Sequence, residues 1–403
     1  MKTVILVGTL DTKGIEYQFA RDRFQKAGIS TILINAGIIG EPPTSVDVTA
    51  IEIALLGGST LSELRAKNDR GSAVSIMTRG VQEKVRQLRA INQCDGIFAL
   101  GGSGGSTIAA AAMRDLPIGV PKILVSTLVT SNAAAFIGES DMILFASVVD
   151  IAGLNSISSK IITNAIDAMI GILNGAVVNL ISTKKLVAAS MFGVTTKCVT
   201  NARSKLEQLG YEVITFHMTG SGGRSMESLI SQGFISGVLD ITTTEICDEI
   251  VGGSLSAGPN RLTAAGAAGI PQVVSVGALD MVNFGPMASV PNKFQNRKFY
   301  AHNENVTLMR TTPEECQKIA MDICAKLSKA KAPVALMIPL RGISAIAVQG
   351  EPFYDRSADE SLFSTLRKNI PSNVELIEVD FAINDEEFSS ACVSKLTQYM
   401  EGK

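Results

Sequence analysis

The chain has 403 residues, of which 46% are hydrophobic and 18% charged, and its formal net charge at pH 7 is −2. This length predicts two or three domains, and the balance of apolar and charged residues excludes a disordered chain. Binding to nucleic-acid phosphates needs clustered Lys and Arg, which a nearly neutral chain without a basic run does not supply. We therefore predict a folded protein that binds a small molecule and not nucleic acid.

Membrane insertion and secretion are disfavoured as well. The longest uncharged stretch, residues 262–279, is interrupted by three glycines and a proline, so we predict no membrane span. Residues 3–8 already form a predicted strand, which leaves no room for a signal peptide. Six scattered cysteines without a Cys-x-x-Cys pair and two histidines predict reduced, buried thiols, no metal site and a cytoplasmic location.

The chain opens with a βαβ pattern. Residues 3–8 are a buried apolar strand, residues 9–14 a polar loop, residues 15–27 a helix and residues 29–35 a second strand. Gly28 ends the helix in the usual manner of a C-terminal cap. Such units are right-handed and build parallel sheets.

The next segment is less regular. Residues 37–72 contain a proline pair and a glycine pair, and we expect them to lie over the carboxyl ends of the strands as a lid. A helix is predicted over residues 74–91. The first half then continues with strands over 96–100, 121–126 and 142–149 and a helix over 155–173.

A glycine-rich loop follows the strand at 96–100 and precedes an alanine-rich helix. Glycines let backbone N–H groups approach an anion closely, and the helix N-terminus adds partial positive charge. The loop lacks the ending of a P-loop and a clean Gly-x-Gly-x-x-Gly spacing, so the alternative is a turn that only packs a helix on the sheet. The predicted phosphate- or carboxylate-binding residues are Gly101, Gly102, Ser103, Gly104, Gly105, Ser106 and Thr107.

A second βαβ pattern begins near residue 184. Strand, helix and strand are predicted over 186–192, 199–209 and 212–216, and residues 202–210 resemble residues 20–28. Later strands are predicted over 272–276 and 334–338, and helices over 313–330 and 385–400. These patterns predict an α/β fold: two Rossmann-like, doubly wound parallel-sheet domains with a cleft between them. We place the domains at residues 1–182, with the glycine loop, and 183–403.

Ligands of such sheets bind outside the carboxyl ends of the strands, where the strand order reverses. In the first half these ends carry Asp11, Lys13 and Thr127 besides the glycine loop. Lys13 would neutralise phosphate charge, and Asp11 would hold Mg²⁺ or accept a proton. The alternative for both is a solvated loop with a local turn.

The second half offers a further set of candidates. Residues 220–224 are glycine-rich and end in Arg224, which, like Arg261, could fork onto a carboxylate or phosphate. Glu245 follows three threonines at a strand end, where it would act as a general base or complement a helix dipole.

Five motifs in order carry a family resemblance over the whole chain: Gly8–Gly14, Gly101–Thr107, Ser126–Asn132, His217–Arg224 and Asp240–Glu245. With them the chain resembles the Tm-1-like ATP-binding family, also named UPF0261. The resemblance implies two Rossmann-like subdomains, ATP as the ligand with or without Mg²⁺, and a homodimer or higher homo-oligomer.

Together these observations predict an ATP- or nucleotide-binding protein, an enzyme that acts on a small acid or phosphorylated metabolite in the interdomain cleft. Asp11, Lys13 and Glu245 are its predicted catalytic residues. Two alternatives remain: a non-catalytic nucleotide or metabolite sensor, and an enzyme of carbon–carbon or acyl chemistry that does not use ATP. Reactive side chains at the ligand favour an enzyme, whereas backbone donors alone favour a sensor.

Overall fold

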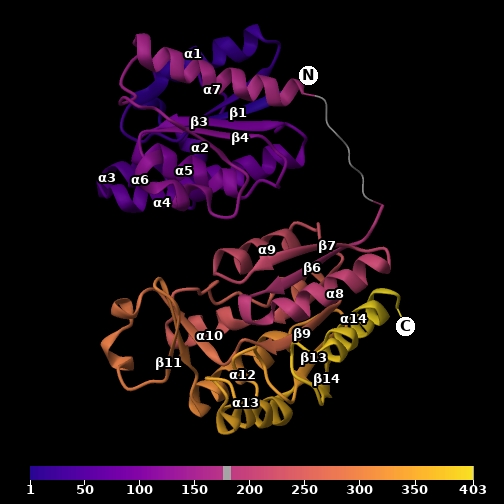
Figure 1. Ribbon diagram of the computed structural model, residues 1–403. Coiled ribbons are helices and arrows are strands. Elements are labelled where there is room, and N and C mark those ends of the chain that lie inside the picture. Colours follow the sequence, from indigo (N-terminus) through magenta and orange to yellow (C-terminus); the bar gives the residue numbers. More distant parts are fainter. Residues whose placement is uncertain (176–182, 403) are drawn as a thin grey trace. The chain divides into compact units, whose positions relative to one another are not determined.

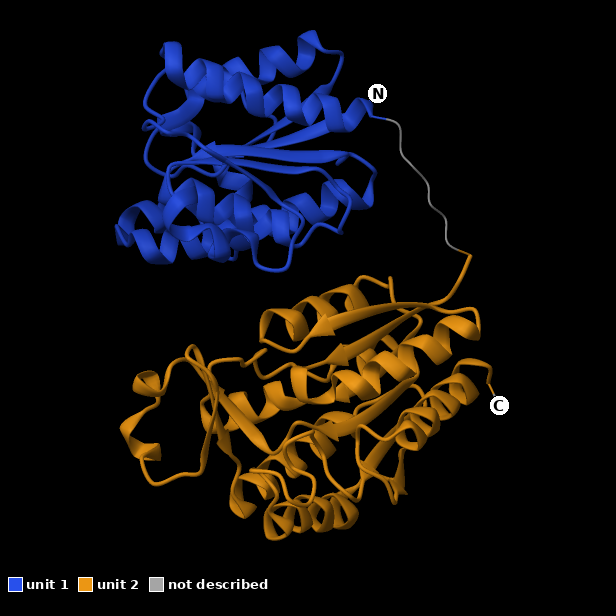
Figure 2. Ribbon diagram, viewed as in Figure 1, with its two compact units in different colours: residues 1–179 blue, residues 180–403 orange. Residues whose placement is uncertain are grey.

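The computed structural model describes residues 1–175 and 183–402. The chain divides into two compact units, residues 1–179 and 180–403 (Figure 2). The predicted boundary between residues 182 and 183 lies at the edge of the described ranges, because residue 182 falls outside them, and it stays a prediction. The expected cleft between the halves also stays a prediction.

Unit 1 contains a five-stranded parallel sheet in the order β2-β1-β3-β4-β5 (Figure 1). The chain moves outward from β1 to β2 and then returns to the other side of β1, so the switch point lies between β1 and β3. The strands are β1 (Thr3–Gly8), β2 (Ser30–Asn35), β3 (Gly96–Gly101), β4 (Lys122–Ser126) and β5 (Ile143–Ala146).

Helices cover both faces of this sheet (Figure 1). α1 (Leu10–Lys26) and α7 (Ser156–Asn174) cover one face, where they pack on Val4 and Leu6. Ile5 and Val7 point to the opposite core, because successive side chains of a strand alternate between faces. That second face is covered by α2 (Ala50–Leu56), α3 (Leu61–Lys67), α4 (Arg70–Ala90), α5 (Ser103–Arg114) and α6 (Val129–Ile137).

Unit 1 departs from the sequence-based expectation at two polar segments. Helix α1 begins at Leu10 and not at residue 15, so Asp11 and Lys13 belong to its first turn. The buried Asn35 side chain supports this start, since its Oδ1 accepts the Leu10 N–H at 3.2 Å across 25 residues. The polar run at 126–132 passes into α6, and the expected lid at 37–72 contains two helices.

Unit 2 contains a six-stranded parallel sheet in the order β7-β6-β8-β9-β13-β14. The first five strands repeat the order of unit 1, which confirms the prediction of two Rossmann-like, doubly wound parallel-sheet halves. The strands are β6 (Leu186–Met191), β7 (Glu212–His217), β8 (Gly237–Thr242), β9 (Gln272–Gly277), β13 (Val334–Pro339) and β14 (Val374–Val379).

A small antiparallel sheet is inserted between β9 and β13. It consists of β10 (Met281–Phe284), β11 (Phe299–Asn303) and β12 (Val306–Arg310). The helices of unit 2 are α8 (Thr196–Gln208), α9 (Ser221–Ser231), α10 (Thr244–Val251), α11 (Ala264–Ala268), α12 (Pro313–Leu327), α13 (Arg356–Asn369) and α14 (Glu386–Met400), with 3₁₀ turns at Gly193–Thr195, Met287–Ser289 and Asn292–Phe294.

Helix α7 is the single described helix that is long and apolar enough to cross a membrane by length and composition. It also supplies Ile162, Ile166 and Met169 to the core against α1, and core helices of folded domains meet the same two criteria. One such helix is weak evidence for a membrane span.

All six cysteines are free and buried. Burial raises the pKa of the Cys94 and Cys316 thiols to about 11, so both are protonated at neutral pH. A protonated thiol is a poor nucleophile, so these cysteines are packing residues, as the sequence predicts.

Candidate functional site

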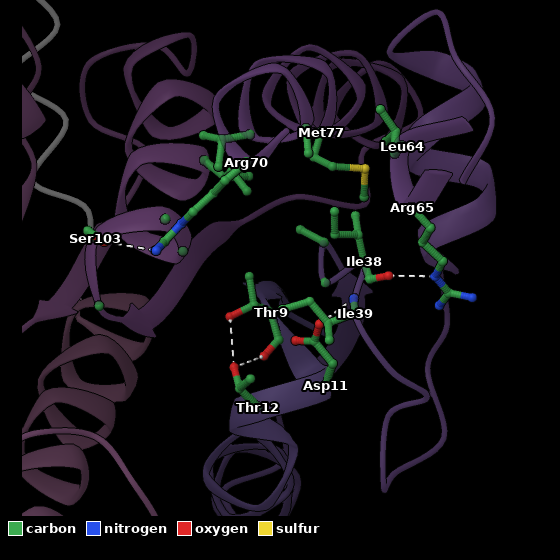
Figure 3. Close-up of a pocket in the computed structure, with 18 of the residues that line it drawn as sticks. Thr9, Asp11, Thr12, Ile38, Ile39, Leu64, Arg65, Arg70, Met77 and Ser103 are labelled. Atoms are coloured by element: carbon green, nitrogen blue, oxygen red, sulfur yellow. Dashed lines mark hydrogen bonds between the residues drawn. The ribbon is translucent and has the colours of Figure 1, made fainter. Parts of the chain in front are cut away.

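A pocket of about 730 Å³, called pocket 1, lies at the carboxyl ends of β1, β2 and β3 in unit 1 (Figure 3). Its walls come from residues 9–13, 36–39, 64–77 and 102–105, with Ile108. Three of these segments follow neighbouring strands, so the pocket occupies the switch point of the sheet.

Tyr17 shapes the strand ends beside pocket 1. The β1–β3 pairing ends at Val7 and Ala99. Directly beyond this pair the fully buried Tyr17 hydroxyl donates to the Val7 carbonyl and accepts the Leu100 N–H at 2.8 Å. The ring passes so close to Gly8 that an added Cβ would lie 2.1 Å from it. Tyr17 therefore bridges the two strands where they end, and Gly8 makes room for its ring.

The glycine loop presents an open helix N-terminus to pocket 1. Gly102 is the N-cap of α5, and no side chain caps this helix. The backbone N–H groups of Ser103, Gly104 and Gly105 have no partner among the described residues, as is usual for the first turn of an uncapped helix. A Cβ added at Gly104 would meet nothing closer than 3.8 Å. This turn has room for an anion and donors to bind it.

Two arginines from the segment 64–77 add positive charge. Arg70, the first residue of α4, donates from Nη2 to Ser103 Oγ at 3.3 Å (Figure 3). Arg65 donates from Nε to the Ile38 carbonyl at 2.5 Å and lies on the other side of the pocket. The guanidinium of Arg70 is thus held at the glycine loop itself, where a bound phosphate would lie.

Asp11 faces the pocket from the first turn of α1. Its Oδ2 accepts the Ile39 N–H at 2.9 Å, whereas its Oδ1 is buried without a hydrogen-bond partner among the described residues. Gly37 permits this position, because a Cβ there would lie 2.4 Å from Oδ1. A buried carboxylate oxygen without a donor is unfavourable, so Oδ1 suits a ligand hydroxyl or a cation.

Lys13 lines the same pocket, but its ammonium group is engaged elsewhere. Nζ donates to the Ile151 carbonyl, and the residue interrupts α1 with non-helical dihedral angles of φ −126° and ψ 16°. Lys13 therefore links α1 to the segment before α7. This bond uses one of the three N–H donors of the ammonium group.

Another part of the wall of pocket 1 is apolar, beside the polar side chains of Asn68 and Asp69. Its side chains come from the segment after β2, from α3, from α4 and from α5, and they are Ile38, Leu64, Val74, Met77 and Ile108. An apolar wall opposite a cationic glycine loop can accommodate a flat, weakly polar group beside an anionic one.

Four of the predicted binding residues of unit 1 lie outside pocket 1. Gly101 ends β3, and Ser106 is buried with its hydroxyl 3.2 Å from the Gly101 carbonyl and 2.7 Å from Ser126 Oγ. Thr107 donates to the Ser103 carbonyl within α5. Thr127 lines a different cavity. The glycine loop thus divides into binding positions at 102–105 and packing positions on either side.

The glycine-rich turn of unit 2 is already filled by the protein. Gly220 and Gly223 donate their N–H groups to Glu245 Oε1 at 2.7 and 3.1 Å. Glu245 is fully buried, and a Cβ at Gly223 would lie 1.9 Å from its Oε2. Burial raises the pKa of this carboxyl, while Arg261 and the two amides oppose the shift. The structure thus places the predicted general base Glu245 inside unit 2, where its carboxyl accepts the N–H groups of this turn.

Arg261 is buried beside Glu245. Its Nη1 and Nη2 both lie 2.6 Å from the two carboxylate oxygens of Asp240, and its Nε lies 2.7 Å from Glu245 Oε2. Glu227 adds a third carboxylate at 3.2 Å. The side chain of Arg261 is 1% exposed, so the structure places this predicted binding residue inside unit 2, paired with carboxylates of the protein.

Arg224 lies on the exposed side of the same turn. Its Nη1 donates to the Ser256 carbonyl at 3.3 Å. Arg224 lines neither pocket 1 nor the cavity that contains Thr127. The structure thus brings together Asp11, Lys13 and residues 102–105 in pocket 1 of unit 1.

The sequence analysis missed four residues that build pocket 1: Tyr17, Asn35, Arg65 and Arg70. Asn35 carried a usable signal, since a polar residue directly after an apolar strand lies at the ligand-binding edge of a parallel sheet. Its Oδ1 also accepts the Gly37 N–H at 2.9 Å and fixes the wall after β2. Tyr17 and the arginines lie within helical segments, where no local pattern distinguishes them.

Among the described residues, no group of three or more His, Cys, Asp or Glu side chains could hold a metal ion. Mg²⁺ in nucleotide sites is often held by one carboxylate together with ligand phosphates. Asp11 with its free Oδ1 fits that mode.

The sequence matches two domains of a known protein family. Residues 2–177 match the N-terminal domain of the uncharacterised protein family UPF0261, and residues 184–400 match its C-terminal domain. A UPF0261 protein of Clostridium tetani is 50% identical over 401 residues, which are 99% of each chain. A UPF0261 protein of Rhizobium meliloti is 41% identical over 98% of each chain.

A plant protein is also similar to this chain. The ToMV resistance protein Tm-1(GCR237) of Solanum lycopersicum is 42% identical over 336 residues, which are 82% of this chain and 45% of the plant protein. Among solved structures, a UDP-GlcNAc 2-epimerase of Methanocaldococcus jannaschii matches with a TM-score of 0.24 at 10% identity, over 98% of this chain and 92% of the other. A similarity this low carries no argument about function.

Proposed function

The chain belongs to the UPF0261 family, and from this premise we propose that it is a nucleotide-binding protein that binds ATP in pocket 1. The observation that carries the proposal is the open N-terminus of α5, where three N–H groups without partners in the described part of the chain face the pocket beside Arg70. Free amides, a helix dipole and a guanidinium together favour a multiply charged anion such as a triphosphate.

The rest of pocket 1 fits the remainder of a nucleotide. The apolar side chains of Ile38, Leu64, Val74 and Met77 provide a surface for a base. Asp11 Oδ1 can accept a ribose hydroxyl or hold Mg²⁺ that is also bound to phosphate oxygens. Mg²⁺, when bound, would neutralise phosphate charge. The volume of about 730 Å³ is in the range of pockets that bind small molecules.

We propose further that the protein is an enzyme, with Asp11 as the residue that accepts a proton from the substrate. A second candidate function is a non-catalytic nucleotide sensor, and two observations favour it. Lys13 donates to the Ile151 carbonyl, and Glu245 is buried in unit 2. Of the three predicted catalytic side chains, Asp11 alone therefore keeps an unsatisfied atom at the pocket.

Calorimetric titration of the whole protein with ATP, with and without Mg²⁺, tests the binding proposal. Gly104→Leu places a side chain in the space for the phosphates. Each hydrogen bond to a charged group contributes about 1.5–3 kcal/mol, so the variant should bind ATP about 10- to 100-fold more weakly. Gly171→Leu is the matched control, because Gly171 lies on α7 with nothing within 4 Å of an added Cβ. Equal affinity of both variants would contradict binding at residues 102–105.

An assay for ADP or AMP release then separates the enzyme from the sensor. Turnover that is lost in Asp11→Asn while ATP still binds supports the enzyme. ATP binding without product release from any tested small molecule supports the sensor.

A further inference from the structure

A second cavity of about 630 Å³, called pocket 2, lies at the carboxyl ends of β4 and β5. It is lined by residues 126–130 and 146–150. The family resemblance and the comparisons assign nothing to this cavity. Its lining includes Thr127, which was expected at the nucleotide.

Pocket 2 adjoins the glycine loop on the side opposite to pocket 1. Gly101 and Ser126 are register partners of β3 and β4, and the Thr127 N–H donates to the Gly101 carbonyl at 3.3 Å. A Cβ added at Gly102 would lie 3.9 Å from Thr127 Oγ1. Since pocket 1 reaches residues 102–105, one short loop separates the two cavities.

The two cavities differ in charge. Pocket 1 is lined by three cationic side chains, Lys13, Arg65 and Arg70, and by two carboxylates, Asp11 and Asp69. The lining of pocket 2 contains one charged side chain, Asp150, and no Lys, Arg or His. A carboxylate or phosphate would therefore find no cationic partner in pocket 2, whereas a neutral or positively charged group would be accepted.

Hydroxyl groups supply the other polar contacts of pocket 2. Ser126 and Ser147 are buried and bind backbone groups of the lining segments. Ser126 Oγ accepts the Leu128 N–H at 3.1 Å, and Ser147 Oγ donates to the Val149 carbonyl at 2.7 Å. The hydroxyls of Thr127 and Thr130 have no protein partner among the described residues. Both can donate to and accept from a ligand hydroxyl.

The rim of pocket 2 contains a strained residue. Val148 has φ +61°, in the left-handed region that a β-branched residue rarely adopts, and its side chain is 81% exposed. The Ser147 carbonyl accepts the Val149 N–H at 2.6 Å across this residue. Strain of this kind persists where surrounding contacts enforce it, and it occurs often at ligand sites.

We propose that pocket 2 is the site of a second small molecule, neutral or positively charged and bearing hydroxyl or amino groups. Thr127 and Thr130 exchange hydrogen bonds with it, and Asp150 accepts from its amino or hydroxyl group. The position next to the phosphates rests on the proposed function of pocket 1, whereas the chemical class rests on the lining of pocket 2 itself. It departs from the small acid that the sequence analysis expected.

Site-directed disulfide trapping tests this proposal. All six native cysteines are buried, so Thr130→Cys would place an accessible thiol at the mouth of pocket 2. The whole protein is incubated under partly reducing conditions with matched disulfide fragments that end in a polyol, an amino alcohol or a carboxylate. Intact-mass spectrometry then measures the labelled fraction. Ser364→Cys on α13, an exposed position of unit 2, is the control.

We expect polyol and amino-alcohol fragments to label Thr130→Cys at least about fivefold more than the carboxylate, a difference of about 1 kcal/mol. Adding Asp150→Asn should remove the preference for the amino group. The control should label equally with all three. Equal labelling at both positions, or a preference for the carboxylate at position 130, would overturn the proposal.

A parallel ATP titration of Thr130→Cys keeps the two proposals apart. Absence of ATP binding with selective labelling would reject the proposed function of pocket 1 and retain the chemistry of pocket 2. Normal ATP binding without selective labelling would reject the proposed chemistry of pocket 2 and retain the proposed function of pocket 1.

Discussion

The two glycine-rich turns of this protein have similar sequences and opposite states. In unit 1 the N–H groups of residues 103–105 are open to pocket 1, and in unit 2 the corresponding donors at Gly220 and Gly223 bind Glu245. Both turns join a parallel strand to a helix. A turn of this kind therefore indicates an anion, and the rest of the fold decides whether that anion is a ligand or a side chain of the protein.

The two turns differ because they follow different strands of their sheets, and only in unit 2 does a neighbouring strand end provide a carboxylate, Glu245, that binds the turn. The turn of unit 2 follows the second strand of its sheet, whereas the glycine loop of unit 1 follows the third. In unit 2 the third strand, β8, is followed by two threonines and Glu245, which reaches back to the neighbouring turn. In unit 1 the third strand is followed by glycines, which have no side chain to reach anything.

The largest effect on stability is expected from Arg261, the cation that pairs with Glu245 at the glycine-rich turn of unit 2. Arg261→Met keeps the volume of the side chain but leaves Asp240, Glu227 and Glu245 without their cation. Removing one partner of a buried ion pair costs about 3–5 kcal/mol, so unit 2 should lose about this much stability. Urea unfolding followed by tyrosine fluorescence measures it, because Tyr211, Tyr300, Tyr354 and Tyr399 all lie in unit 2.

Arg341→Met is the control for Arg261→Met. Arg341 pairs with Asp380 at 2.7 Å, and both side chains are more than half exposed. Solvent-exposed pairs contribute about 0–1 kcal/mol. A comparable loss in the two variants would mean that the filled turn is not a stabilising element.

In unit 1, Tyr17→Phe tests whether the hydroxyl that bridges β1 and β3 stabilises the strand ends beside pocket 1. The change removes the hydroxyl that bridges Val7 and Leu100, and an unsatisfied buried group costs about 1–3 kcal/mol. Hydrogen exchange of peptides from β1 and β3 should become faster, and ATP should bind more weakly. Tyr399→Phe, whose hydroxyl donates to the exposed Glu375, should leave that exchange unchanged; acceleration in both variants would refute the bridge.

A pH dependence should also distinguish the units. Burial raises the pKa of Asp248 in unit 2 to about 7, against about 4 in an unfolded chain. Between these values the folded state holds a proton that the unfolded state has released, so this group makes unit 2 less stable as the pH rises from 4 to 7. Between pH 4 and 7, Asp248→Asn should make the slope of the free energy of unfolding against pH less negative by up to about 1.4 kcal/mol per pH unit.

Asp359 provides the internal reference for this slope. Burial raises its pKa to about 7 as well, so its contribution should persist in Asp248→Asn. Denaturant unfolding at pH 5, 6 and 7 gives the slope. An identical slope in wild type and variant would show that Asp248 does not take up a proton on folding.

The smallest effect is expected at Arg224, which the sequence placed at a second anion site. Because Glu245 already fills that turn, Arg224→Ala should leave ATP affinity unchanged and alter stability by less than about 0.5 kcal/mol, as for most surface changes. Arg70→Ala is the matched change at the open turn and should weaken ATP binding about tenfold or more. Equal effects of the two would remove the distinction between the turns.

The sequence by itself determined the scaffold. Apolar runs such as residues 3–8 and 96–100, the glycines that end helices and the repeated βαβ spacing predicted two parallel-sheet halves, which the structure confirms. They also placed Asp11, Lys13 and Gly102–Gly105 together, because the carboxyl ends of neighbouring parallel strands meet at one edge. These are consequences of local periodicity and of the fixed direction of parallel strands.

Tertiary structure alone decided which charged side chains line pocket 1 and which are buried in pairs. Glu245 and Arg261 look like site residues in sequence, yet they lie inside unit 2, and Tyr17 and Arg70 look ordinary, yet they build pocket 1. The Lys13 ammonium finds the Ile151 carbonyl 138 residues away. Burial and pairing of a charge depend on groups that are distant along the chain, and no local pattern specifies them.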